Sequence, residues 1–242
     1  MRLMSRLRDE RGITLMEVLS AATVGFVVLA GVFGLLESSV RLNTGVLAKT
    51  DSMQRGRIAM DKLTQQLRSQ VCLDLDNPAV LVGATDNSMT FYADFSKADA
   101  SKPPEKRTVS YDPATTNIVA RIYKPTVATN PTPSDYPSLA TPTTSDLVFE
   151  HAGLAKDTFG VTLPFLTYYA YQTVGATPHP EPTLRLPAPL DAAEAARVAR
   201  IDIQFVAFPT RSNDVKNAVN MTDQISVRHA DPNLTVPDPA CV

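Results

Sequence analysis

Two hydrophobic patterns follow one another without a break near the start of the chain. Residues 13–36 form a run of 24 residues in which Glu17 is the only charged side chain. Beyond this run, apolar residues recur mostly at steps of three, four or seven, and they are Leu42, Val46, Met53, Met60, Leu63, Leu67 and Val71. Such spacing is typical of an amphipathic helix. Because no proline occurs before Pro78, the pattern predicts one helix of about 55–60 residues, from near Ile13 to near Val71.

After Pro78 the pattern changes to short β-branched and aromatic stretches that alternate with turn residues, which is typical of strands. The predicted strands are residues 79–82, 88–93, 107–111, 118–123, 146–150, 166–173, 183–186, 199–208 and 224–228. Residues 112–117 are predicted to form a hairpin turn, and residues 192–198 a short helix. One long helix with several short strands predicts an α+β fold, in which an antiparallel sheet packs on the helix.

Two segments rich in proline, residues 124–145 and 178–189, are predicted to be exposed loops within this domain. They are either tolerated insertions or surfaces for partner recognition. The tail from residue 231 onward is predicted to be irregular.

The junction between the basic leader and the apolar run carries a specific motif. Residues 11–17 read Arg-Gly-Ile-Thr-Leu-Met-Glu, so that a glycine directly precedes the apolar run and Glu17 lies inside it. A carboxylate within a membrane-length segment is energetically costly, which indicates that Glu17 has a function. The motif resembles the N-terminal signature of type IV prepilins and type II secretion pseudopilins.

That resemblance implies roles for particular residues. A membrane-embedded prepilin peptidase would cleave after Gly12 and methylate the new N-terminus at Ile13. Glu17 would neutralise the N-terminal ammonium of an adjacent subunit, because opposite charges attract more strongly at low dielectric. The implied fold is pilin-like, and the implied partners are other pilin or pseudopilin subunits and the inner-membrane assembly platform.

The resemblance also divides the chain into four parts. Residues 1–12 are the leader peptide, 13–36 the transmembrane or filament-core helix, 37–72 its amphipathic continuation, and 73–242 a β-rich domain outside the cytoplasm. The order of these parts is most similar to the minor subunits of the family, the J-type pseudopilins and W-type minor pilins. Such a subunit is placed at or near the filament tip and primes assembly. A major pilin and a component of a DNA-uptake pilus are the alternatives within the family.

Two simpler interpretations of the N-terminus are open. A plain single-pass anchor accounts for the length and for the basic flank, through the positive-inside rule. It accounts for neither Gly12 nor Glu17, and it would leave the chain a membrane-anchored domain with no filament role. A secretory signal has a shorter apolar region and a small-residue cleavage site, which residues 36–41 do not provide.

The net charge and the cysteine content bear on nucleic-acid binding and on a possible disulfide. The full chain has 23 basic and 25 acidic residues, of which four arginines and two acidic residues lie in residues 1–12. Residues 13–242 therefore hold 19 basic and 23 acidic residues, a net charge of −4. This charge does not predict nucleic-acid binding. Cys72 and Cys241 are the two cysteines, and export makes a disulfide between them possible; the alternative is two unpaired thiols.

No catalytic or metal-binding motif is present in the sequence. His151, His179 and His229 lie far apart in unrelated contexts and are expected to be surface residues. Asp74, Asp76 and Asn77 form an oxygen-rich cluster that could bind calcium, but it lacks the spacing of an EF-hand loop. We expect these residues instead to be solvent-exposed where the chain leaves the helix. The sequence therefore predicts a structural subunit without cofactor or metal, and not an enzyme.

Overall fold

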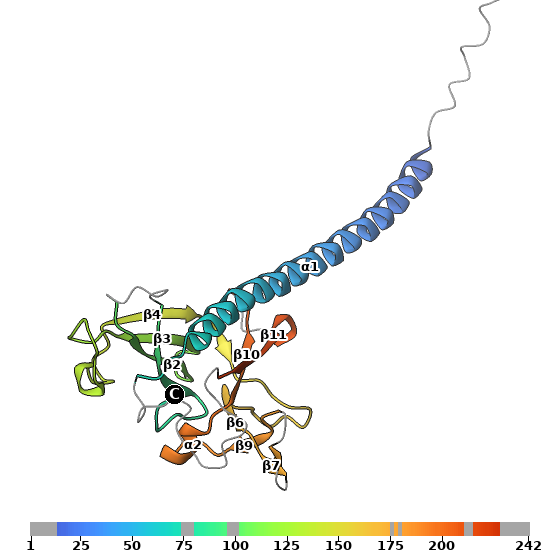
Figure 1. Ribbon diagram of the computed structural model, residues 1–242. Coiled ribbons are helices and arrows are strands. Elements are labelled where there is room, and N and C mark those ends of the chain that lie inside the picture. Colours follow the sequence, from blue (N-terminus) through green and yellow to red (C-terminus); the bar gives the residue numbers. More distant parts are fainter. Residues whose placement is uncertain are drawn as a thin grey trace, which may run out of the picture. The chain divides into compact units, whose positions relative to one another are not determined.

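The structure, a computed structural model, describes residues 14–73, 80–95, 102–174, 177–178, 181–210 and 215–227. Its first element is the helix α1 (Leu15–Arg68), 54 residues long (Figure 1). The chain divides into two compact units, Met1–Leu47 and Ala48–Val242.

The first unit contains the apolar part of α1. Its side chains from Leu15 to Thr44 are exposed, including large ones such as Phe26 and Phe33. By length and composition, this helix could cross a membrane. A helix that is apolar on all sides and exposes its side chains requires a non-aqueous environment or other helices to cover it.

In the second unit, one face of α1 is part of the protein core. The buried positions are Ser52, Gly56, Ala59, Met60, Leu63, Thr64 and Leu67. Gly56 is needed for close packing, because a Cβ atom at this position would lie 3.0 Å from both the Ala207 Cβ and the Met221 side chain. The absence of a side chain at Gly56 therefore lets the helix lie directly against these two residues.

The first sheet is antiparallel and consists of β1 (Ser88–Ala93), β2 (Glu105–Asp112), β3 (Asn117–Tyr123) and β4 (Thr144–Phe149), in that order. The turn between β2 and β3 is held by Asp112, whose carboxylate accepts bonds from Ala114 N–H at 2.9 Å and the Thr115 hydroxyl at 2.8 Å. These bonds hold the pKa of Asp112 below its usual value. Thr116 completes the turn in the left-handed region, at φ 56°.

The second sheet has the strand order β11 (Val219–Ser226), β10 (Arg200–Ala207), β6 (Leu166–Ala170), β9 (Leu184–Leu186). The short strand β5 (Ala152–Gly153) also pairs with β10, while β7 (Thr173–Val174) and β8 (Thr177–Pro178) pair with each other. The remaining elements are the helix α2 (Ala192–Ala196) and the 3-10 helices η1 (Pro133–Asp135) and η2 (Val215–Asn217). All pairings between named strands in the described part of the chain are antiparallel.

Both sheets and the end of α1 share one hydrophobic core. The two sheets meet through aromatic rings: the Phe205 centroid from β10 lies 5.5 Å from that of Phe149 in β4 and 6.5 Å from that of Phe165. Tyr168 of β6 is buried and donates its hydroxyl to the Thr85 carbonyl at 2.9 Å. This burial raises the pKa of Tyr168. The second unit is therefore held together as a single domain.

The loop from Lys124 to Thr143 is mostly exposed, as predicted, but it is anchored to the first sheet. Tyr136 is buried against Tyr92, with ring centroids 5.2 Å apart, and donates its hydroxyl to the Pro104 carbonyl at 2.8 Å. Tyr123 donates to the Leu139 carbonyl at 2.9 Å. The segment thus has a fixed path over the sheet.

The predicted α+β class is confirmed in its main features, namely a long apolar N-terminal helix and antiparallel sheets. The strand predicted at 224–228 instead covers Val219–Ser226, because its polar, outward-facing residues conceal the pattern. Where a strand was predicted at 79–82, residue 79 lies outside the described residues and Val80 makes an isolated bridge to Phe91.

Candidate functional site

The start of α1 is held by a reciprocal cap between Thr14 and Glu17. Thr14 donates its backbone N–H and its hydroxyl to Oε2 of Glu17, both at 3.2 Å, and Glu17 N–H lies 3.4 Å from the Thr14 hydroxyl oxygen. This is the capping-box arrangement, in which a threonine and a glutamate three residues later satisfy donors at a helix start. The negative carboxylate also interacts favourably with the helix dipole at this end.

The second oxygen of the Glu17 carboxylate, Oε1, has no partner among the described residues. A carboxylate can accept several hydrogen bonds at once. Glu17 can therefore cap its own helix through Oε2 and still accept a further donor through Oε1.

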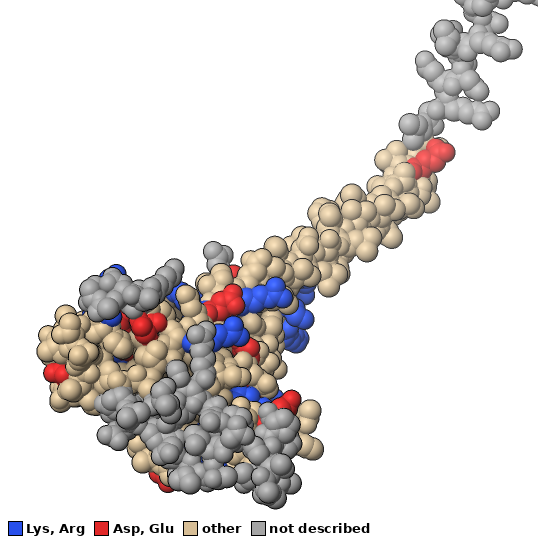
Figure 2. All heavy atoms as spheres, viewed as in Figure 1, with Lys and Arg blue, Asp and Glu red and all other residues tan. Residues whose placement is uncertain are grey.

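Around Glu17 the helix surface is uncharged. The following apolar positions, among them Val18, Leu19 and Val24, are exposed. In Figure 2 the corresponding stretch of helix shows neither basic nor acidic spheres on the face in view, apart from the acidic group near its start. An isolated carboxylate on such a surface would be costly in a bilayer without a positive partner.

The other predicted processing residues, Gly12 and Ile13, lie outside the described residues. Cleavage after Gly12 and methylation at Ile13 therefore stay predictions.

Cys72 follows the end of α1 and is disulfide-bonded in the structure. Its side chain packs against the hydrophobic core. The predicted partner, Cys241, lies outside the described residues, so that this pairing stays a prediction.

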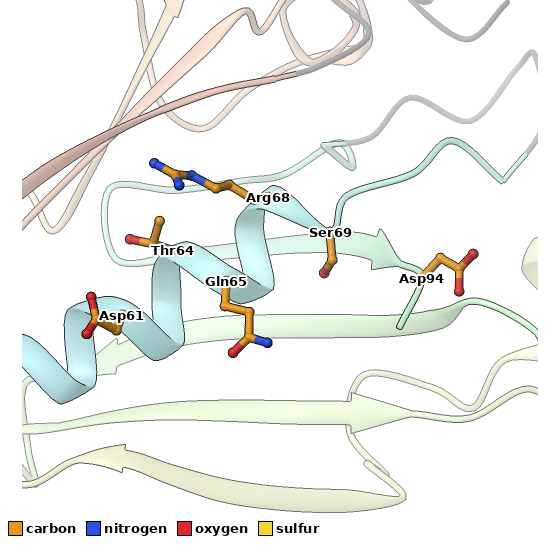
Figure 3. A pocket seen from close by; sticks show the side chains of 6 residues that line it. All are labelled: Asp61, Thr64, Gln65, Arg68, Ser69 and Asp94. Carbon is orange, nitrogen blue, oxygen red and sulfur yellow. The ribbon is translucent and has the colours of Figure 1, made fainter. Parts of the chain in front are cut away.

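A solvent-open hollow lies along the last turns of α1 in the second unit. It is lined by Asp61, Thr64, Gln65, Arg68 and Ser69 of the helix region and by Asp94, which follows β1 (Figure 3). The two hydroxyls in it already donate hydrogen bonds. Thr64 donates to the Asp223 carboxylate and Ser69 to the Gln66 carbonyl, each at 2.7 Å. These groups tie α1 to β11 and close its last turn, and the lining includes neither histidine nor cysteine.

The remaining candidates for metal binding are histidine and acidic side chains. The part of the chain that the structure describes contains no group of three His, Cys, Asp or Glu side chains able to hold a metal ion. His151 lies between β4 and β5 in the left-handed region, at φ 58°, and its carbonyl accepts Phe208 N–H at 3.1 Å. His179, His229, Asp74, Asp76 and Asn77 lie outside the described residues.

The role of Thr14 as a helix cap was not predicted from the sequence. The signal was available, because Thr-x-x-Glu before an apolar run is a helix-start motif. The sequence singled out Glu17 for its charge within the apolar run and for its place in the motif of residues 11–17, and the geometry adds a local, structural role.

No family model, no curated protein and no solved structure matches this chain. The chain's own residues and geometry are therefore the basis for assigning a function.

Proposed function

We propose that this chain is a minor subunit of a type IV pilus or type II secretion pseudopilus. Prepilin peptidase processes it after Gly12, and the subunit enters the filament at or near the tip, where it primes assembly. It acts as a structural component and not as an enzyme, and its mature domain faces outward from the cytoplasmic membrane. The α+β fold, with a long apolar helix leading into antiparallel sheets, is consistent with a pilin-like subunit.

The observation that carries this proposal is the length of exposed apolar helix. Leu42, Val46 and Leu47 are 69%, 63% and 67% exposed, and they follow the membrane-length run of residues 13–36. The hydrocarbon core of a bilayer is about 30 Å thick and is crossed by about 20 helical residues. A plain anchor would leave these three side chains in water, whereas neighbouring helices in a filament would cover them.

The geometry of Glu17 supports the same assignment. Its Oε2 caps the helix, and its Oε1 can accept the N-terminal ammonium of an adjacent subunit. An ion pair formed in this way would compensate the cost of a carboxylate in an apolar environment.

The test is the mass of the mature N-terminal peptide, measured from membranes of cells with and without prepilin peptidase. We expect a peptide that begins at Ile13 in the first sample, with or without an added methyl group, and residues 1–12 retained in the second. Retention of residues 1–12 in both samples would exclude a processed subunit and favour a plain anchor.

The position in the filament needs a second measurement. The abundance of the chain in sheared filaments, relative to the main repeating subunit, separates a minor subunit from a major one. We expect a small fraction of the total; a comparable abundance would contradict the minor assignment.

A further inference from the structure

The outer face of the second sheet carries polar side chains in register across three strands. Residues of β10 alternate between the core and this face, so that Asp202 and Gln204 face outward while Ile203 is buried. Thr167 of β6 lies opposite Asp202, and Gln224 of β11 lies opposite Asp202 on its other side. Adjacent strands lie about 4.8 Å apart and successive outward residues about 7 Å apart, so one small ligand can contact several of these groups.

A solvent-open hollow lies over β6, β10 and β11, which are labelled in Figure 1. Its volume is about 530 Å³, within the range of about 300–1,000 Å³ that small-molecule sites occupy. Most such sites are lined by apolar groups, whereas this one is lined mainly by polar groups. It is here called the β10 hollow, and its lining includes Thr167, Tyr169, Asp202, Gln204, Thr222 and Gln224.

Thr167 is the most buried of these polar side chains. It is 6% exposed, and its hydroxyl has no hydrogen-bond partner among the described residues. Because Thr167 lines the β10 hollow, its hydroxyl is reached from that side. A buried hydroxyl costs free energy unless a partner bonds to it, and a molecule in the hollow, either water or a ligand, can supply that partner.

Arg200, which precedes these residues on β10, holds two of the lining side chains in place. Its Nε lies 2.9 Å from Oδ1 of Asp202, and its Cζ lies 4.0 Å from the centroid of the Tyr169 ring. The guanidinium covers one face of that ring, which leaves the other face and the hydroxyl for the hollow. Side chains that are positioned before binding lose less conformational entropy when a ligand binds.

The charges at the β10 hollow disfavour an ionic ligand. The lining contains neither lysine nor arginine, so no side chain in it balances a phosphate or another anion. Its two carboxylates already have partners. Asp202 pairs with Arg200, while Asp223 accepts the Thr64 hydroxyl at 2.7 Å and the Gln224 N–H at 2.8 Å. The ligand is therefore expected to be uncharged.

Five neutral groups of the lining can each both donate and accept a hydrogen bond. They are the hydroxyls of Thr167, Tyr169 and Thr222 and the side-chain amides of Gln204 and Gln224. None of these groups has a partner among the described residues. The hydroxyl groups of sugars also donate and accept, and the ring of Tyr169 adds apolar surface on which the C–H groups of a sugar can pack.

We propose that the β10 hollow binds a neutral oligosaccharide. Its hydroxyl groups bond to the Thr167 hydroxyl, the Asp202 carboxylate and the Gln224 amide, and one sugar ring packs on Tyr169. A peptide fits this surface less well, because β10 is paired on both sides and has no free main-chain groups for strand addition. The inference does not depend on the proposed filament role, and its test does not use processing at Gly12 as a readout.

The test is calorimetric titration of the full chain, purified in a detergent without a sugar headgroup so that the detergent does not compete. The neutral probes are the tetrasaccharides of maltose, cellulose, chitin and mannan. Tetragalacturonate is the acidic comparison, and a glycine–serine hexapeptide is the peptide comparison. We expect at least one neutral tetrasaccharide to bind with a Kd below about 1 mM, and the two comparison probes to bind at least about tenfold more weakly.

Two outcomes of this titration would overturn the proposal. One is the absence of binding by all four neutral tetrasaccharides. The other is binding of tetragalacturonate or of the hexapeptide as tight as that of the best neutral probe, which would indicate an anion site or a peptide site instead.

Substitutions then locate the binding at the β10 hollow. Thr167→Val and Gln224→Ala should each weaken binding of the best neutral probe about fivefold, the loss expected for one neutral hydrogen bond. Asn220→Ala is the matched control, because Asn220 is an exposed amide at another outward position of β11, opposite Val206 and outside the lining. Equal binding by the Gln224 and Asn220 variants would place the ligand elsewhere and refute the assignment.

Thermal unfolding separates a lost contact from a damaged fold. Gln224 and Asn220 are both exposed, so neither alanine variant should change the unfolding temperature. Thr167→Val keeps the shape of the side chain and should also fold. If it does not, the comparison of Gln224→Ala with Asn220→Ala still decides the proposal.

Discussion

Replacing Glu17 by glutamine separates the two roles of its carboxylate. Glutamine also serves at this position of a capping box, so Glu17→Gln keeps an acceptor for the two 3.2 Å bonds from Thr14 and removes only the charge. Glu17→Ala removes both the acceptor and the charge. Thr14→Val removes the hydroxyl but leaves the charge and the backbone donor in place.

The magnitudes of the two roles differ enough to be distinguished. An ammonium and a carboxylate about 4 Å apart attract by about 4 kcal/mol at an effective dielectric constant of about 20. If desolvation offsets half of this, about 2 kcal/mol remains, which is about 30-fold in an equilibrium constant. Loss of a helix cap costs about 1 kcal/mol, or about fivefold.

The assay is the fraction of the chain recovered in sheared filaments relative to the membrane pool, with the N-terminal peptide mass as a check on processing. We expect normal cleavage in all three variants, a loss of about 30-fold or more for Glu17→Gln and Glu17→Ala, and a loss of a few-fold for Thr14→Val. Wild-type recovery of Glu17→Gln together with failure of Glu17→Ala would refute the charge-pairing argument and leave capping as the role of Glu17.

Three further predictions concern the stability of the second unit. Thr116→Gly should raise its free energy of unfolding by about 1 kcal/mol, because a β-branched residue is unfavourable at φ 56°; thermal unfolding in detergent measures the change. Gly56→Leu should lower the free energy of unfolding by about 1–3 kcal/mol, because even a Cβ atom at this position would lie 3.0 Å from Ala207 and Met221. Gly56→Ala should lower the free energy of unfolding by less. Wild-type stability of the leucine variant would contradict close packing at Gly56. Cys72→Ser should cost about 2–5 kcal/mol through loss of the disulfide, and a reductant should lower the unfolding temperature of the wild-type chain but not of the variant.

The helix was predictable because its signal is long and comes from local spacing. An apolar run followed by an amphipathic stripe, with no proline, predicted its extent to within about three residues at either end (Leu15–Arg68). The hairpin of β2 and β3 was predictable for a similar reason, since a turn-forming sequence separates two β-branched stretches. Such signals depend on residues close together in the chain.

Other features depend on contacts between distant residues and carry no local signal. The strand β11 pairs with β10 over its whole length, yet its alternate residues are polar because they face outward. Glycine is unfavourable inside a helix by propensity, and the reason for Gly56 appears only when Ala207 and Met221 are brought against it. The anchoring of the proline-rich loop by Tyr136 likewise requires β1 and Pro104 to be in place.

The candidate site was predictable to a different degree. Its charge in an apolar run and its place in the motif of residues 11–17 identified Glu17, but the exposure of Phe159 has no counterpart in the sequence pattern. A phenylalanine between Thr158 and Gly160 could equally be a core residue, and only its exposure distinguishes the two cases.

The shared core of α1 and the two sheets has a consequence for how this protein can be divided. The buried face of the helix begins at Ser52, so the exposed apolar segment and the start of the second unit lie within one continuous helix. A water-soluble fragment that starts at Ala48 keeps every buried position of α1 and loses the apolar run. One that starts after Arg68 loses Leu63 and Leu67 from the core and should not fold. The second unit therefore cannot be separated from the last turns of α1, and any proteolytic release of it in folded form must cut the helix upstream of Ser52.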